Sequence, residues 1–216
     1  DPVAVADQAF LFKHAAREIA IAHGLNAVFM AKPIAGEAGS SMHLHQSVVD
    51  AGGRNIFSQP DGSEDPRFRQ FIAGMQTHLP DLMLMLAPNV NSYRRFVKGS
   101  QAPIHLQWGY DNRTAGLRVP MSDAQSRRVE NRLSGADANP YLAMAASLAC
   151  GYLGMVEGLS PSDPITGSAH DMPFSLPRNL DGAIQQLRQC EPLIELLSEA
   201  FVAAFGLVKE AEYEVF

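Results

Sequence analysis

The chain has 216 residues, of which 46% are hydrophobic and 19% are charged. A chain of this length and composition buries a sizeable core, so disorder is excluded as its main state. The formal net charge of -6 argues against nucleic-acid and anionic-membrane partners, because such binders need a basic excess. Two cysteines, Cys150 and Cys190, are too few for a disulfide scaffold. They indicate a reducing compartment, and we expect a cytoplasmic protein.

The most apolar stretch of the chain, residues 141–156, is shorter than the roughly 20 residues that cross a bilayer. We therefore expect a core helix there and no membrane partner. The chain opens on Asp1 with a helical pattern and lacks the charged and apolar regions of a signal peptide. The absence of an initiating Met indicates a fragment of a longer protein.

The N-terminal third predicts one long helix followed by two strands. Apolar residues at three- and four-residue spacings predict a helix over 3–23, ended by Gly24. A short buried strand is expected at Ala27–Met30, and a second strand at Ser41–Val49. A Gly- and Pro-rich loop follows, in which the Gly52-Gly53 pair predicts a hairpin.

The middle and C-terminal parts predict helices on either side of short strands. Pro66 starts a helix that runs to about His78, and Pro80 separates it from a second apolar helix. Strands are expected at 104–110, 116–119 and 127–133, and helices at 82–86, 139–158 and from 180 onward. Antiparallel strands with flanking helices and a helical C-terminal part predict a single α+β unit.

Basic residues are concentrated in the middle of the chain. Residues 89–133 contain eight Arg and Lys against three acids, whereas residues 191–216 contain one Lys against six Glu. A local excess of arginine within an acidic protein predicts a pocket for phosphate or carboxylate groups.

The first candidate site is the pair His43 and His45 on a predicted strand. Residues two apart on a strand point to the same side, so both imidazoles could face one metal ion or a phosphate oxygen. The alternative is a purely structural pair. A metal-dependent hydrolase built on these two residues would need further ligands that the sequence does not place.

The second candidate is Arg128, Glu130 and Arg132, which share one face of a predicted strand. A carboxylate between two arginines suits a metal-binding Glu beside guanidinium groups that hold an anionic substrate. The alternative is a solvated ladder of ion pairs at the surface, since buried charges are costly.

Further arginines lie on neighbouring segments. Arg113 and Arg118 could converge on a triphosphate, because planar donors neutralise the charge that develops in phosphoryl transfer. Arg95 precedes a Gly-containing loop with Gln101 that could close over a substrate. The chain contains no phosphate-binding motif of the G-x-x-x-x-G-K-[ST] or G-x-G-x-x-G kind.

Taken together, these segments resemble the catalytic domain of the glutamine synthetase family. The resemblance covers residues 1–160 and is carried by GSSMHLHQS at 39–47, APNVNSYRR at 87–95, Ala102-Pro103 with WGYDNR at 108–113, and RVENR at 128–132 followed by ANPYLA at 138–143. Ala31-Lys32-Pro33 and the segment after Trp108 look most like the branch of γ-glutamylputrescine synthetases and related γ-glutamyl-amine ligases.

The resemblance implies a two-step reaction. ATP phosphorylates the γ-carboxylate of glutamate, and ammonia or an amine then displaces phosphate from the γ-glutamyl phosphate. It implies Mg²⁺ or Mn²⁺ held by His43 and Glu130. By the same resemblance, ATP would be bound by Ser47, Arg113, Arg118 and Arg128, and glutamate by Gly39, Arg95 and Arg132.

Two positions depart from the family pattern. The family usually has Asn before the glycine at position 39, where this chain has Ala38. Ammonia-using members carry Glu at the lid position occupied here by Gln101. Because a neutral amide cannot deprotonate ammonium, Gln101 favours a primary amine as the nucleophile.

The resemblance also implies a domain organisation. We expect residues 1–216 to be part of a catalytic domain that lacks the N-terminal β domain and its own first part. The whole protein would form a homo-oligomeric ring, and the 216 residues alone would be inactive. The alternative is a non-catalytic domain of the same fold that serves in oligomerisation or ligand sensing.

Overall fold

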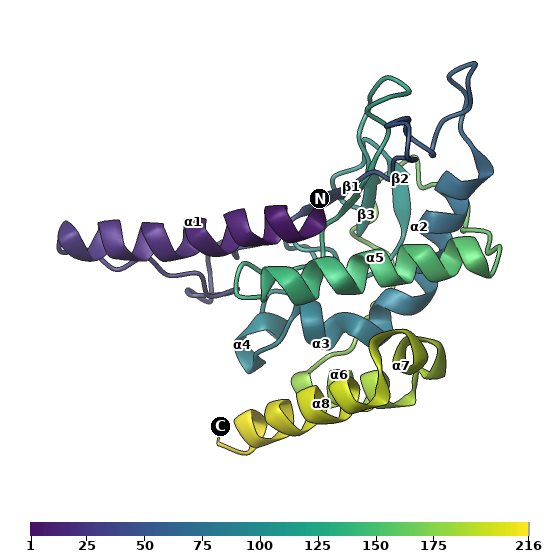
Figure 1. Cartoon of the computed structure of the whole chain (residues 1–216). Helices are drawn as coiled ribbons and strands as arrows, with labels where there is room; N and C mark the ends of the chain where they lie inside the picture. Colours follow the sequence, from purple (N-terminus) through teal and green to yellow (C-terminus); the bar gives the residue numbers. More distant parts are fainter. Residues whose placement is uncertain (216) are drawn as a thin grey trace.

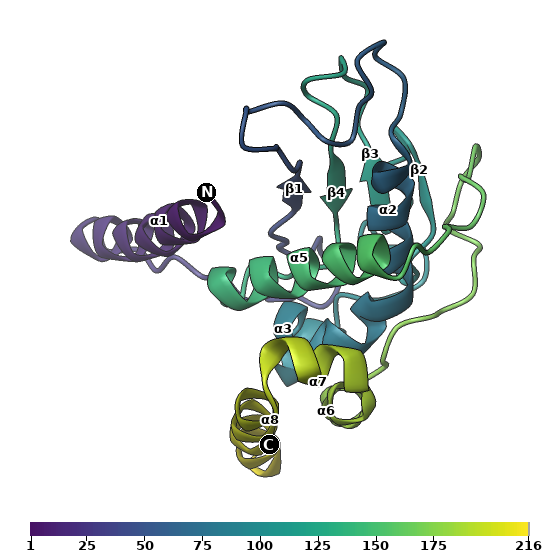
Figure 2. The same cartoon turned by 45° about the vertical axis from the view of Figure 1, so that its right-hand side comes forward.

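A small sheet forms the upper part of the molecule (Figures 1 and 2). The computed structural model describes residues 1–215, and its sheet has the strand order β1-β4-β3-β2. The strands are β1 (Leu44–Gln46), β2 (Trp108–Tyr110), β3 (Leu117–Val119) and β4 (Val129–Asn131). Each lies inside a predicted strand but is shorter, because pairing ends where the chain turns into loops.

Two of the three strand pairings are antiparallel, as expected. β4 pairs antiparallel with both β1 and β3, whereas β2 and β3 are parallel. Because β2 and β3 run in the same direction, the chain must reverse its direction twice within the short link 111–116. Asp111 adopts a left-handed conformation at φ 45°, which provides one of these turns.

The helices α2 (Pro66–His78) and α5 (Pro140–Val156) pack closely against each other, with α5 below the sheet and α2 beside it (Figure 2). Both have the predicted starts, with Asp65 and Asn139 as caps followed by proline. Their backbones meet at glycines: a Cβ on Gly74 would lie 2.6 Å from the Cα of Gly154. This close approach brings the base of the sheet and α2 into one hydrophobic core.

The chain between α2 and the arginine-rich region is almost entirely buried. Pro80 lies in the 3-10 helix η1 (Leu79–Leu82), which continues into α3 (Met83–Leu86). Pro80 therefore does not separate two helices as predicted. The chain passes from α2 through one 3-10 turn directly into α3. A short helix, α4 (Val90–Tyr93), follows where loops and strands were expected. It is stabilised by a capping box in which Ser92 and Asn89 satisfy each other's backbone amides.

The C-terminal helices form a layer on the other side of α5 from the sheet (Figures 1 and 2). They are α6 (Leu180–Gln189), α7 (Glu191–Leu197) and α8 (Glu199–Glu214). The segment 157–179 precedes them and runs along β2; a loop was expected there after a helix ending at about Gly158. Its path is fixed where Ile165 N–H donates to the Trp108 carbonyl at 2.8 Å and the Trp108 indole donates to the Ser162 carbonyl at 2.7 Å.

The first helix, α1 (Pro2–Ala22), extends away from the rest of the molecule (Figure 1), and Ala6 is its one buried residue. The strand predicted at Ala27–Met30 is wrong. This segment is extended but has no neighbouring strand, and its Phe29 instead packs on α1, with its ring centroid 6.4 Å from that of Phe12. In the part of the chain that the structure describes, no helix has the length and apolar character of a membrane span.

Candidate functional site

The register of the sheet brings three charged or polar side chains into one row. In β1 and β4 His45 lies opposite Glu130, and in β3 and β4 Arg118 lies opposite the same residue. On either side of this row, Leu44, Gln46, Val129 and Asn131 turn to the buried face. The alternation of side chains expected from the sequence therefore places His45, Glu130 and Arg118 together on the other face of the sheet.

Glu130 is the centre of this site. Its carboxylate lies 2.8 Å from His43 Nδ1, 2.9 Å from an Arg118 nitrogen and 3.0 Å from an Arg132 nitrogen. The residue is only 2% exposed. A surface ladder of ion pairs would be solvated, so that interpretation of Arg128, Glu130 and Arg132 is wrong.

The surrounding cations keep Glu130 ionised. Burial alone would raise its pKa, but hydrogen bonds from His43 and Arg118 and the charge of Arg132 lower it to about 2. A carboxylate held in this way stays negatively charged at any physiological pH. Arg118, Arg128 and Arg132 outnumber the carboxylates of Glu130 and Asp111, and this excess of positive charge favours an anionic ligand nearby.

Asp111 and Arg128 contact the residues of this cluster and help to position them. Arg118 also forms an ion pair with Asp111, the residue in the left-handed turn before β3. Arg128 Nε lies 3.4 Å from His45 Nδ1, so the imidazole stands between Arg128 and Glu130. Burial and the neighbouring arginines lower the pKa of His45, although Glu130 raises it. His45 is therefore kept neutral.

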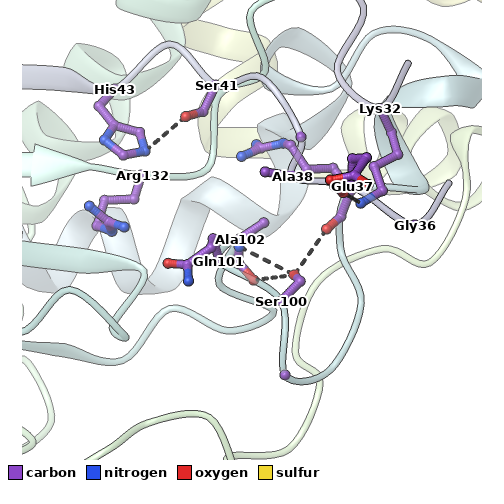
Figure 3. Close-up of a pocket in the computed structure, with 13 residues that line it drawn as sticks. Lys32, Gly36, Glu37, Ala38, Ser41, His43, Ser100, Gln101, Ala102 and Arg132 are labelled. Atoms are coloured by element: carbon purple, nitrogen blue, oxygen red, sulfur yellow. Dashed lines mark hydrogen bonds between the residues drawn. The ribbon is translucent and has the colours of Figure 1, made fainter. Parts of the chain in front are cut away.

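A pocket of about 470 Å³ adjoins this cluster. Figure 3 shows His43 and Arg132 at one end and Lys32 and Glu37 at the other, with Gln101 between them. Gly39 and Arg95 also line it. The structure thus brings together five residues that the sequence placed in the metal, glutamate and lid sites: Gly39, His43, Arg95, Gln101 and Arg132.

Two buried arginines, Arg95 and Arg132, line this region. Arg95 is 4% exposed and donates to the Leu133 carbonyl, while Arg132 is 8% exposed. Among the described residues, neither Nε atom has a hydrogen-bond partner. Burial lowers the pKa of Arg95, the charge of Asp137 opposes this change, and the charge of Arg132 adds to it. The pKa that results is about 10. Buried guanidinium groups with free donors are suited to a carboxylate ligand.

Gly39 is required by close packing. A Cβ at this position would lie 2.6 Å from the Ala31 carbonyl oxygen and 2.9 Å from Arg95 Cγ. Any side chain would push Arg95 away from its place in the pocket. The sequence predicted Gly39 for its backbone, and the structure adds this steric reason.

Several site residues were not predicted from the sequence. Ser41 Oγ lies 3.1 Å from His43 Nε2 and fixes the ring from the side opposite Glu130. Lys32 and Glu37 line the far end of the pocket. Asn91 holds this loop through two reciprocal 2.9 Å hydrogen bonds with the backbone of Lys32. Lys32 precedes the loop from Gly36 to Gly39 and Glu37 lies within it, and this loop was the available signal in the sequence.

None of the four predicted ATP-binding residues, Ser47, Arg113, Arg118 and Arg128, lines the pocket. Ser47 is exposed just after β1, and Arg128 is half-buried beside His45. Arg113 is exposed and lines a separate depression with Thr114 and Gly167. The structure therefore places Arg118, but not Arg113, in direct contact with the Glu130 cluster.

The donor set beside the pocket fits a divalent cation. His43 Nδ1 and Glu130 Oε1 are 2.8 Å apart, and neighbouring ligands of an octahedral ion with bonds of about 2.1 Å lie about 3 Å apart. A hydrolase site needs a third close ligand. Within residues 1–215, His43, His45 and Glu130 do not form a mutually close set of three ligand atoms. The hydrolase interpretation is therefore not supported.

Comparisons with known proteins agree with this site. A family model described as the glutamine synthetase catalytic domain matches residues 1–216. The Escherichia coli gamma-glutamylputrescine synthetase PuuA is 38% identical over 209 residues, which cover 95% of this chain and 44% of that protein. A glutamate–isopropylamine ligase of a Pseudomonas species is 38% identical over 215 residues, covering 97% of this chain and 47% of that protein.

A solved structure described as a GmaS/ADP complex has the same fold. It superposes with a TM-score of 0.89 at 34% identity, covering 99% of this chain and 51% of that one. The chain thus spans about half the length of the relatives it matches. With a matching family model along its whole length and relatives at 38% identity, the chain belongs to the glutamine synthetase family.

Proposed function

We propose that the protein containing this chain is an ATP-dependent ligase that joins glutamate to an amine as a γ-glutamyl amide. The observation that carries the proposal is the pair of buried arginines, Arg95 and Arg132, in a pocket that opens directly onto the Glu130 cluster. One end of such a site suits a carboxylate substrate and the other suits phosphate. The names of the two ligases at 38% identity support this assignment.

In the first step, a γ-carboxylate oxygen of glutamate attacks the γ-phosphorus of ATP. A P–O bond forms to the carboxylate, the bond to the β-phosphate oxygen breaks, and ADP leaves. Negative charge is spread over the transferring group, and fixed cations stabilise it without reorganising. Arg118 is suited to this role, because Asp111 and Glu130 hold its guanidinium from two sides. Arg132 and Arg95 would hold the amino acid.

In the second step, the amine nitrogen attacks the acyl carbon of γ-glutamyl phosphate. The C–O bond to phosphate breaks, and phosphate leaves with the oxygen that came from the carboxylate. The nitrogen gives up one proton in this step. Gln101 lines the pocket but carries a neutral amide, so we assign the proton to water and the binding of the amine to its carbon chain.

A divalent cation, Mg²⁺ or Mn²⁺, would be held by His43 and Glu130. When bound, it would neutralise charge on the ATP phosphates. Ser47, Arg113 and Arg128 are assigned to the nucleotide on the strength of their motifs. We further propose a homo-oligomeric ring in the cytoplasm, as in the family that the motifs resemble.

The test is a comparison of amines in the intact protein. ATP, glutamate and Mg²⁺ are supplied with ammonium, putrescine, ethanolamine or isopropylamine, and γ-glutamyl amides are identified by mass spectrometry. We expect amide formation, with a higher kcat/KM for at least one carbon-chain amine than for ammonium. If no amide forms although ATP and glutamate bind, the alternative of a non-catalytic ligand-sensing domain is correct.

A further inference from the structure

A second cluster of metal-type ligands lies among the helices, on the other side of α5 from the sheet. It consists of His78 at the end of α2, Asp81 in η1 and Cys190 between α6 and α7. One ligand atom from each lies within 4.8 Å of the other two. His78 is only 6% exposed.

The backbone fixes all three positions. His78 and Asp81 are three residues apart across the junction of α2 and η1, a spacing that places side chains on one face. Cys190 occupies the kink between α6 and α7, where its carbonyl accepts from Leu193 and Ile194 at 3.1 and 3.0 Å. The cluster is therefore assembled by the docking of the C-terminal layer and not by flexible side chains.

A fourth polar group completes the surroundings of His78. Glu157, the C-cap of α5, places Oε2 at 3.2 Å from His78 Nε2. Histidines that bind metals usually have a carboxylate beside the ring, which holds the imidazole in place. The cluster thus combines nitrogen, oxygen and sulfur ligands with a supporting acid.

We propose that His78, Asp81 and Cys190 form a structural site for Zn²⁺ or a similar thiophilic divalent cation. Zn²⁺ accepts this mixture of ligands, whereas Mg²⁺ prefers oxygen. Tetrahedral bonds of about 2.0–2.3 Å place ligand atoms about 3.3–3.8 Å apart, so separations of at most 4.8 Å would shorten by no more than about 1.0–1.5 Å when the ion binds. A thiolate and a carboxylate would balance the two charges of the ion. Zinc would then tie α2 and η1 to the C-terminal helices.

The competing explanation is a hydrogen-bonded cluster that never binds metal. In that state the Cys190 thiol donates to Asp81, and burial together with this hydrogen bond raises the pKa of Cys190 to about 11. Both explanations account for the geometry. They differ in whether a metal–sulfur bond forms when the ion is supplied.

Co²⁺ reports such a bond directly, because a cobalt–thiolate bond absorbs in the near ultraviolet and tetrahedral Co²⁺ absorbs in the visible. The full chain, stripped with a chelator, is titrated with Co²⁺ and then with Zn²⁺. We expect one equivalent of Co²⁺ to give the thiolate band and Zn²⁺ to displace it. The titration is repeated with Cys190→Ser, which should lose the band, and with Glu157→Gln, which should bind about tenfold more weakly.

The matched control is Cys150→Ser. Cys150 is also buried in a helix, but it is not among the three clustered ligands, so this variant should keep the band. Glu130→Gln should also keep it, which separates this site from the pocket. Absence of the band in the folded wild-type chain, or a band that persists in Cys190→Ser, would overturn the proposal. Circular dichroism of each variant establishes that it is folded.

Discussion

Glu130 and Asp81 are the centres of two clusters with opposite charge balance. Around Glu130, the guanidinium groups of Arg118, Arg128 and Arg132 outnumber the carboxylates of Glu130 and Asp111, so that cluster carries more positive than negative charge. Asp81 lies beside an imidazole and a thiol, with Glu157 next to the imidazole. The comparison shows that a carboxylate does not by itself define a ligand. Its neighbours decide whether the site attracts phosphate and carboxylate groups or a soft cation.

The largest expected effect comes from removing the carboxylate of the first cluster. Glu130→Ala should lower kcat of the intact protein by at least about 10³-fold, because the cation site and the arrangement of Arg118 are both lost. It should also cost about 3 kcal/mol in the free energy of unfolding, since two arginines lose their shared partner. Amide formation and urea denaturation measure these effects. The matched control is Glu157→Ala in the second cluster, which should leave kcat unchanged.

The second largest effect is expected from a change in the packing of Gly39 against Arg95. Gly39→Ala should raise the KM for glutamate about tenfold, because the new Cβ collides with the Ala31 carbonyl and displaces Arg95. Gly36→Ala is the matched control. It changes another glycine that lines the same pocket, but its Cβ would meet no atom within 4 Å. Equal KM values for the two variants would show that the position of Arg95 does not govern glutamate binding.

The two clusters should also respond to different cations. After chelation, Mg²⁺ or Mn²⁺ should restore amide formation, whereas Zn²⁺ should raise the melting temperature. The rise should be about 5 °C at 100 times its dissociation constant. Cys190→Ser should abolish this rise and leave activation by Mg²⁺ intact. A Zn²⁺ effect of the same size in Cys190→Ser would place the ion elsewhere.

The smallest expected effect concerns the choice of amine. Gln101→Glu should raise kcat/KM for ammonium several-fold relative to putrescine, because a carboxylate in the pocket attracts and deprotonates ammonium. The ratio of the two values, measured in the wild type and the variant, tests this directly. If the wild type already prefers ammonium and the ratio does not change, Gln101 does not select the nucleophile.

Local signals predicted those parts of the fold that local interactions determine. The start of α2 at Pro66 follows from its Asp65 cap, and α5 begins in the same way at Asn139. The alternation around His45 and Glu130 identified the polar face of the sheet. The strand at Ala27–Met30 was wrong because a strand also needs a partner, and Phe29 packs on α1 instead.

The sequence patterns did not predict features that depend on contacts between distant segments of the chain. The parallel pairing of β2 with β3 and the cluster at His78, Asp81 and Cys190 both arise from how remote segments dock. Gly39, His43 and Arg132, which the motifs singled out, line one pocket. They gave no sign that Arg113 lies in a separate depression.

The central claim is that the arginine-rich pocket activates the γ-carboxylate of glutamate as an acyl phosphate. Glutamate labelled with ¹⁸O in its γ-carboxylate tests this most directly. During turnover with ATP and an amine in the intact protein, each released phosphate should carry one ¹⁸O atom, because the carboxylate oxygen leaves with phosphorus. Phosphate without label, released together with amide, would contradict the proposed course of the reaction.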